Sequence, residues 1–124
     1  MSHESLYQKA HAAGVAAGDA AVPSPMVVFE RESPFDDSSP VVKVYEPIME
    51  GPCGFAYVLI RPGTHPFAKY LRKVGLSHKA YYGGEEMSVR MFGQSVERKY
   101  AYAQAFAAVL QEAGVKAYAS SRLD

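Results

Sequence analysis

The chain has 124 residues, of which 13 are lysine or arginine and 13 are aspartate or glutamate, so its formal net charge is zero. Hydrophobic residues account for 48% and charged residues for 21%, which excludes a disordered or fibrous protein and fits one globular domain over residues 1–124. The longest apolar runs have six residues, far fewer than the ~20 of a membrane-spanning helix, so we expect no membrane partner.

The N-terminal segment has the pattern of a helix, from about His3 to Ala21 within residues 1–21. Ala10, Gly14 and Gly18 recur every four residues, so one helix face lacks bulky side chains and another backbone can approach it closely. We expect this face to pack on the last helix of the chain or on a second copy, which would form a homodimer. The first residues, MSHESLYQ, lack a basic and apolar export signal, so we expect a cytoplasmic location.

Two short segments with β-branched residues come next, at 26–30 and 41–46. They flank the polar, proline-containing sequence RESPFDDSSP. We therefore expect a hairpin whose loop, residues 31–40, is acidic and mobile.

The strongest strand pattern is FAYVLIRP, from Phe55 to Pro62. Its nearly continuous apolar character predicts a central strand covered on both faces. Cys53 lies just before it and is the only cysteine, which excludes an internal disulfide and a zinc site with several cysteines. We expect Cys53 to be a small buried thiol.

The next helix is predicted to begin with Thr64 as its N-cap and to end at Gly75. Its apolar side chains recur at helical spacing, at Phe67, Tyr70, Leu71 and Val74. A Gly-Gly turn and a strand over residues 86–92 should follow.

The last helix is predicted to begin after Ser95 and to end at Gly114, with a wide apolar face over residues 102–113. Residues 115–119 can then return as a short strand. This order of elements predicts an α+β fold with a small, largely antiparallel sheet packed by two to three helices.

The zero net charge hides a division along the chain. Residues 1–50 hold eight acidic and three basic residues, whereas residues 51–124 hold ten basic and five acidic ones. Such a division can mark a surface for an anionic partner, although the two halves can also neutralise each other within one domain.

Two clusters of candidate ligand-binding residues fall in the basic half. The first cluster combines basic with aromatic residues, as in proteins that hold single-stranded nucleic acid. Its members are Lys69, Arg72, Lys73, His78, Lys79, Tyr81 and Tyr82. The alternative is a solvated helix face. The second cluster lies at a helix N-terminus that can bind an anion or can simply be capped, and it consists of Gln94, Ser95, Arg98 and Lys99. Arg122 and Asp124 could join either cluster, pair with each other, or lie free at the terminus.

Catalytic and metal-binding patterns are not recognisable. The four histidines lack the spacing of metal ligands, and YYGGEE lacks the lysine of a phosphate-binding loop, so a tight turn is the simpler interpretation. No nucleophile, base and orienting group can be identified together. We therefore expect a protein without metal or cofactor that is not an enzyme.

The segments GPCGFAYVLIRPGTHPFAKYLRKVGL and QSVERKYAYAQAFAAVLQEAGVKAYASSRLD resemble a group of small uncharacterised proteins encoded by tailed bacteriophages and prophages. The resemblance covers residues 51–124, with a weaker similarity in AHAAGVAAGDAAVPSPMVV and none over residues 30–50. It implies a phage accessory protein made inside the bacterium, and it implies no particular activity or site residue.

Two functional hypotheses follow from the sequence. The first is a non-enzymatic protein that binds nucleic acid or a nucleotide through a basic patch in residues 61–99. The second is an interaction module that binds and modulates a host protein through the acidic segment 30–50.

Overall fold

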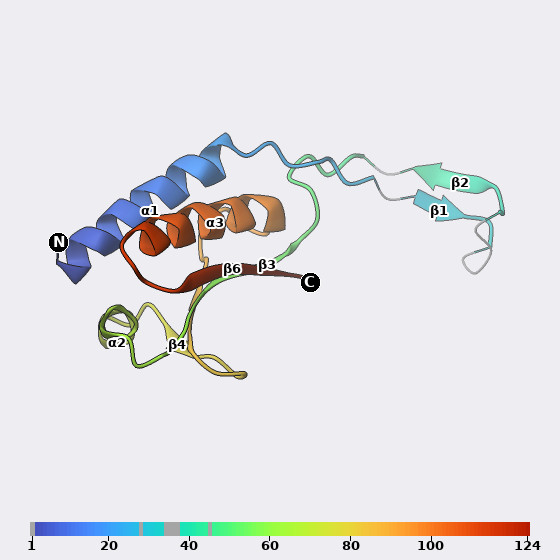
Figure 1. The fold of residues 1–124 in the computed structure, drawn as a ribbon. Helices are drawn as coiled ribbons and strands as arrows, with labels where there is room; N and C mark the ends of the chain where they lie inside the picture. The colour runs from blue at the N-terminus through green and yellow to red at the C-terminus, as the bar shows by residue number, and fades with distance from the viewer. Residues whose placement is uncertain (1, 28, 34–37, 45) are drawn as a thin grey trace.

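Three helices and six short strands are described in the computed structural model, which covers residues 2–27, 29–33, 38–44 and 46–124 (Figure 1). In chain order they are α1 (His3–Ala20), β1 (Phe29–Arg31), β2 (Val41–Val44), β3 (Gly54–Ile60), α2 (Pro66–Lys73), β4 (His78–Lys79), β5 (Glu85–Ser88), α3 (Val96–Glu112) and β6 (Ala117–Leu123). β3 to β6 form an antiparallel sheet of order β4-β5-β3-β6. The predicted α+β class is confirmed.

β3 is the central strand, as predicted, but its two faces are not equally covered. Ala56, Val58 and Ile60 are buried on the face where α3 packs, whereas Tyr57 and Leu59 on the opposite face are only half-buried. The expectation of cover on both faces was wrong, because a continuous apolar run does not distinguish a fully buried strand from one with a half-exposed face.

α1 lies along α3 (Figure 1), and its face of small residues makes this close approach possible. A Cβ atom at Gly14 would lie 2.5 Å from the ring of Tyr102, and one at Gly18 would collide with the ring of Phe92. The expected packing of α1 on the last helix is therefore confirmed. The same face is thus not available to a second copy.

The predicted hairpin is present as the antiparallel pair β1 and β2, with strands shorter than expected. It extends away from the helices and the four-stranded sheet (Figure 1). Residues 34–37 of the predicted mobile acidic loop lie outside the described residues. At the described base of the loop, the guanidinium of Arg31 donates to the carbonyl of Ser39 at 2.9 Å.

α2 begins one residue later than predicted. Its N-cap is His65, whose Nδ1 atom accepts from the backbone N–H of Phe67 at 3.0 Å, and Pro66 occupies the first turn. Thr64 therefore lies outside the helix, which leaves its hydroxyl free of the capping role. Val74 was expected on the apolar face, but it follows the helix and is exposed.

The C-terminal strand is longer than predicted. β6 continues to Leu123 and pairs with the full length of β3, so Arg122 belongs to the sheet and not to a free end. The strand predicted over residues 86–92 is the shorter β5, which pairs with β4 across the turn. Among the described residues, none of the helices combines the length and the hydropathy that crossing a bilayer requires.

Candidate anion-binding site

An open hollow of about 580 Å³ lies between α2 and the turn that joins β4 to β5. It brings together four basic side chains from two elements and two glycines from neighbouring loops. The residues that line it are Gly63, Thr64, Lys69, Arg72, Lys73, Lys79 and Gly84. We call this hollow the basic pocket.

Three of these bases carry uncompensated charge. Lys69 and Lys73 are exposed and lie one turn apart on α2, and Lys79 faces them from β4. Within the described chain, none of the three forms an ion pair. Like charges gathered around one hollow raise its positive potential, which favours an anion there.

Arg72 has a different role. Its Nε atom donates to Glu85 Oε2 at 3.0 Å and its Nη2 atom contacts Glu85 Oε1, while the hydroxyl of Ser77 donates to the same carboxylate at 2.7 Å. The Glu85 side chain is only 1% exposed, so it needs these partners. Arg72 thus ties α2 to β5, and we expect its reversal to glutamate to damage the fold, unlike reversal of the neighbouring lysines.

The pairing makes stability depend on pH. The hydrogen bond from Arg72 holds the pKa of Glu85 below its usual value, although burial acts in the opposite direction. A carboxyl whose pKa is lowered by folding stabilises the protein above about pH 5, and this contribution is lost as the pH falls through the lowered pKa. We predict that Glu85→Gln is less stable than the wild type at pH 7. In urea denaturation series, the difference should shrink toward pH 3, and a constant difference would contradict this assignment.

The two glycines let the loops on either side of the basic pocket approach each other. A Cβ atom at Gly84 would lie 2.7 Å from the carbonyl of Ile60, and one at Gly63 would lie 3.2 Å from Gly84. Gly84 also has a φ of +84° in the turn, where Ala80 donates its N–H to the Gly84 carbonyl at 2.9 Å. The tight turn inferred from YYGGEE is therefore present, and it lies at the edge of the pocket.

Tyr81 and Tyr82 lie at the tip of this turn and are 92% and 87% exposed. Their rings meet edge to face with centroids 4.8 Å apart. Since exposed tyrosine rings contribute nothing to the core, their apolar faces are available to a ligand that extends beyond the pocket. Arg61 lies close by, with its Nε atom donating to the Gly83 carbonyl at 3.4 Å.

His78 does not join the basic pocket. It lies on the sheet face opposite the helices, where its Nε2 atom is 3.1 Å from the carboxylate of Glu86. The alternation of side chains along β4 therefore separates His78 from Lys79.

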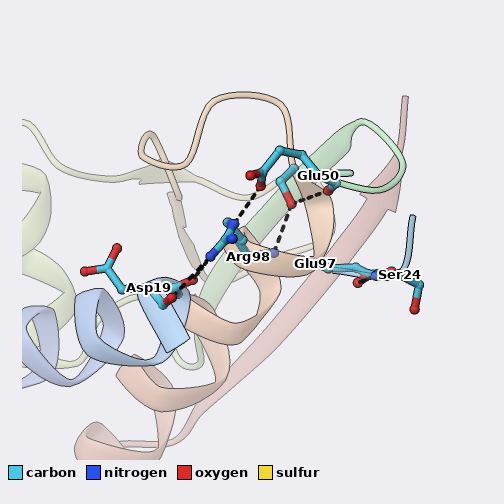
Figure 2. A network of polar contacts seen from close by, with 7 residues as sticks. Asp19, Ser24, Glu50, Glu97 and Arg98 are labelled. Atoms are coloured by element: carbon cyan, nitrogen blue, oxygen red, sulfur yellow. Dashed lines mark hydrogen bonds and ion pairs between the residues drawn. The ribbon is translucent and has the colours of Figure 1, made fainter. Parts of the chain in front are cut away.

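The second predicted cluster has a structural role (Figure 2). The guanidinium of Arg98 donates to Glu50 Oε2 at 2.6 Å and to the carbonyls of Gly18 and Asp19 at 2.9 and 3.3 Å. Ser95 caps α3 and donates its hydroxyl to the Glu50 carbonyl at 2.8 Å. These contacts tie the end of α1 and the segment before β3 to the start of α3, so the Ser95 hydroxyl and the Arg98 guanidinium are already engaged by groups of the protein itself.

Lys99 and Arg122 lie apart from the basic pocket. Lys99 is buried and donates to the Gly54 carbonyl at 3.2 Å. Both cations lie over the ring of Phe55, with Lys99 Nζ at 5.6 Å and Arg122 Cζ at 5.1 Å from its centroid. They belong to the Gly54 end of β3, whereas Glu85, the partner of Arg72, pairs with Ile60 at the other end. The basic residues of the two predicted clusters therefore do not form one common site.

Cys53 is exposed, so the expectation of a buried thiol was wrong. It precedes β3, and its side chain borders a separate hollow of about 520 Å³ that also contains Glu50 and Arg98. Among the described residues, no three histidine, cysteine or acidic side chains gather as metal ligands would.

Comparison with known protein families, with curated proteins and with solved structures gives no match to this chain.

Proposed function

We propose that this chain is a non-enzymatic binding protein whose basic pocket holds the phosphates of single-stranded nucleic acid. The observation that carries the proposal is the convergence of Lys69, Lys73 and Lys79 beside two exposed tyrosine rings, since these three ammonium groups have no ion-pair partner among the described residues. Single-stranded nucleic acid needs both kinds of group, because cations neutralise its phosphates and aromatic rings stack on its nucleobases.

A nucleotide offers the same phosphate chemistry as a strand. A strand is favoured because the pocket is open and the tyrosines stand outside it, so a ligand that uses both groups must extend along the surface. Competition of an oligonucleotide against free mononucleotide separates the two ligands.

Salt dependence tests the proposal. With Arg72 bound to Glu85, three lysines remain for phosphate contacts, and counterion release then gives a slope of about −2 for log affinity against log salt concentration. Fluorescence anisotropy with a labelled single-stranded oligonucleotide at several salt concentrations measures this slope. Absence of binding at low salt would contradict the proposal.

Tyr82 should contribute through stacking. We predict that Tyr82→Ala weakens binding by about fivefold to a hundredfold, because a stacked base is worth ~1–3 kcal/mol. The salt slope should stay the same, since a stacked ring releases no counterion. Tyr82→Phe keeps the ring and should retain the affinity, so equal losses in both variants would contradict stacking.

The resemblance to proteins of tailed phages and prophages supports a place inside the bacterial cytoplasm, where such an accessory protein meets nucleic acid. We also propose a homodimer, independently of nucleic-acid binding, with the open edge of the sheet as its surface.

A host-protein module is a second candidate, supported by the β1–β2 hairpin. The hairpin projects from the domain and exposes Val41 and Val44, and the segment that follows exposes Met49. Exposed apolar side chains among acidic residues suit a protein surface better than a phosphate. Replacing residues 29–44 by a short glycine-serine turn should remove a host partner and leave oligonucleotide binding intact.

A further inference from the structure

β6 forms an open edge of the four-stranded sheet. It pairs with β3 without a register shift, from Gly54 opposite Leu123 to Ile60 opposite Ala117, and no described strand pairs with its other side. The backbone carbonyl of Lys116 accepts from the N–H of Arg61, and the N–H of Asp124 donates to the carbonyl of Cys53. The even-numbered residues of β6 therefore direct their backbone groups toward β3. By the alternation of antiparallel pairing, the odd-numbered residues 117–123 direct theirs outward.

This edge lacks several of the usual protections against pairing. The sequence AYASSRL contains no proline and no lysine, and the strand has no bulge. Gln111 donates to the carbonyl of Ala117 at 2.6 Å, which occupies one of the two lone pairs of that oxygen. Tyr118 and Leu123 are 51% and 66% exposed beside the open edge. The edge is thus suited to accept another strand.

We propose that the edge is covered by β6 of a second copy, paired antiparallel around a two-fold axis at Ser120. This register places Ala119 opposite Ser121 of the partner subunit, so the outward backbone groups of both strands meet. The two sheets then join into one continuous sheet across the axis. Such an interface is self-complementary, as two-fold symmetry requires.

The charged and aromatic side chains within and beside β6 match this register. Lys116 lies opposite the partner's Asp124, which gives an ion pair at each end of the interface. Tyr118 lies opposite the partner's Arg122, whose guanidinium already contacts the ring of Phe55.

The apolar face of the strand fits as well. Ala117 lies opposite the partner's Leu123, beside a hollow of about 360 Å³ that Gln111 and Gly114 also line. This hollow gives the exposed leucine a place to lie. Leu123 would then lose its exposure to water on pairing.

Neighbouring registers are less favourable. An axis at residue 119 places Lys116 opposite the partner's Arg122, and an axis at residue 121 places Tyr118 opposite the partner's Asp124. Within one chain, Lys116 and Asp124 lie at opposite ends of the strand, roughly 26 Å apart at ~3.3 Å per residue. Their opposite charges therefore cannot form an ion pair with each other within one chain.

The dimer does not depend on anion binding, because the basic pocket lies near β4 and β5, on the other side of β3. Failure of either proposal leaves the other standing.

Sedimentation equilibrium over a range of protein concentrations tests the interface. We expect the wild type to dimerise and Lys116→Asp or Asp124→Lys alone to raise the dimer Kd about tenfold at low salt, because two attractive pairs become repulsive. The double exchange, Lys116→Asp with Asp124→Lys, should restore the wild-type Kd. A wild type that stays monomeric at high concentration, or single variants that the double exchange does not rescue, would overturn the proposal.

Ser121→Pro provides a second variant. It removes an outward N–H without touching the bonds to β3, since Ser121 points its backbone away from that strand. We expect the dimer to be lost while the circular dichroism spectrum stays that of the wild type. A dimer of unchanged Kd in this folded variant would also overturn the proposal.

Discussion

Replacing Lys73 and Lys79 together by glutamate is expected to reduce the affinity for a single-stranded oligonucleotide about a hundredfold or more at low salt. Two phosphate contacts are lost, and the new carboxylates repel the strand. The fold should remain intact, because both lysines are exposed and neither forms an ion pair in the described chain. Fluorescence anisotropy gives the affinity, and the thermal midpoint gives the stability.

A control variant with the same change in net charge distinguishes an effect of the basic pocket from an effect of the protein's overall electrostatic potential. Lys9→Glu with Arg90→Glu changes the net charge by the same amount, and both residues are exposed and lie outside the residues that line the pocket. This control should bind almost as tightly as the wild type. Equal losses in both double variants would mean that the pocket is not the binding site.

Gly14→Leu is expected to destabilise the protein by about 3 kcal/mol through overpacking. The first added carbon would already lie 2.5 Å from the Tyr102 ring. Tyr102 cannot move aside easily, because it is buried and its hydroxyl is 2.6 Å from Nδ1 of His11. Urea denaturation measures the free energy of unfolding.

Ala12→Leu on the exposed side of α1 is the matched control and should leave the midpoint close to that of the wild type. An unchanged midpoint in Gly14→Leu would show that α1 does not depend on this close packing. Because the small-residue face of α1 packs inside the domain, substitutions on α1 should leave the oligomeric state of the folded protein unchanged.

Local signals in the sequence predicted the helices well. Ser95 and Gly114 bound α3 as expected, since a capping hydroxyl and a glycine with positive φ act within one turn of the helix. Thr64 failed as a cap because the next residue, His65, supplies a ring nitrogen to the Phe67 N–H. Hydroxyl caps are the common pattern, and a histidine cap is not readable from spacing.

The candidate site was predictable only where its residues share an element. Lys69 and Lys73 are four residues apart on one helix, so their common face follows from the sequence. The pairing of Arg72 with Glu85 and of Arg98 with Glu50 joins residues distant in the chain, and no local pattern reveals such partners. These acidic partners determine which basic side chains are left unpaired and can contact a ligand.

The direct test of the central claim is to locate the ligand on the protein by nuclear magnetic resonance. We expect titration with a short single-stranded oligonucleotide to shift the amide signals of Gly63, Thr64 and residues 79–84, which surround the basic pocket, and to leave those of the β1–β2 hairpin unchanged. Shifts confined to the hairpin, or none at low salt, would contradict the assignment of the basic pocket as a nucleic-acid site.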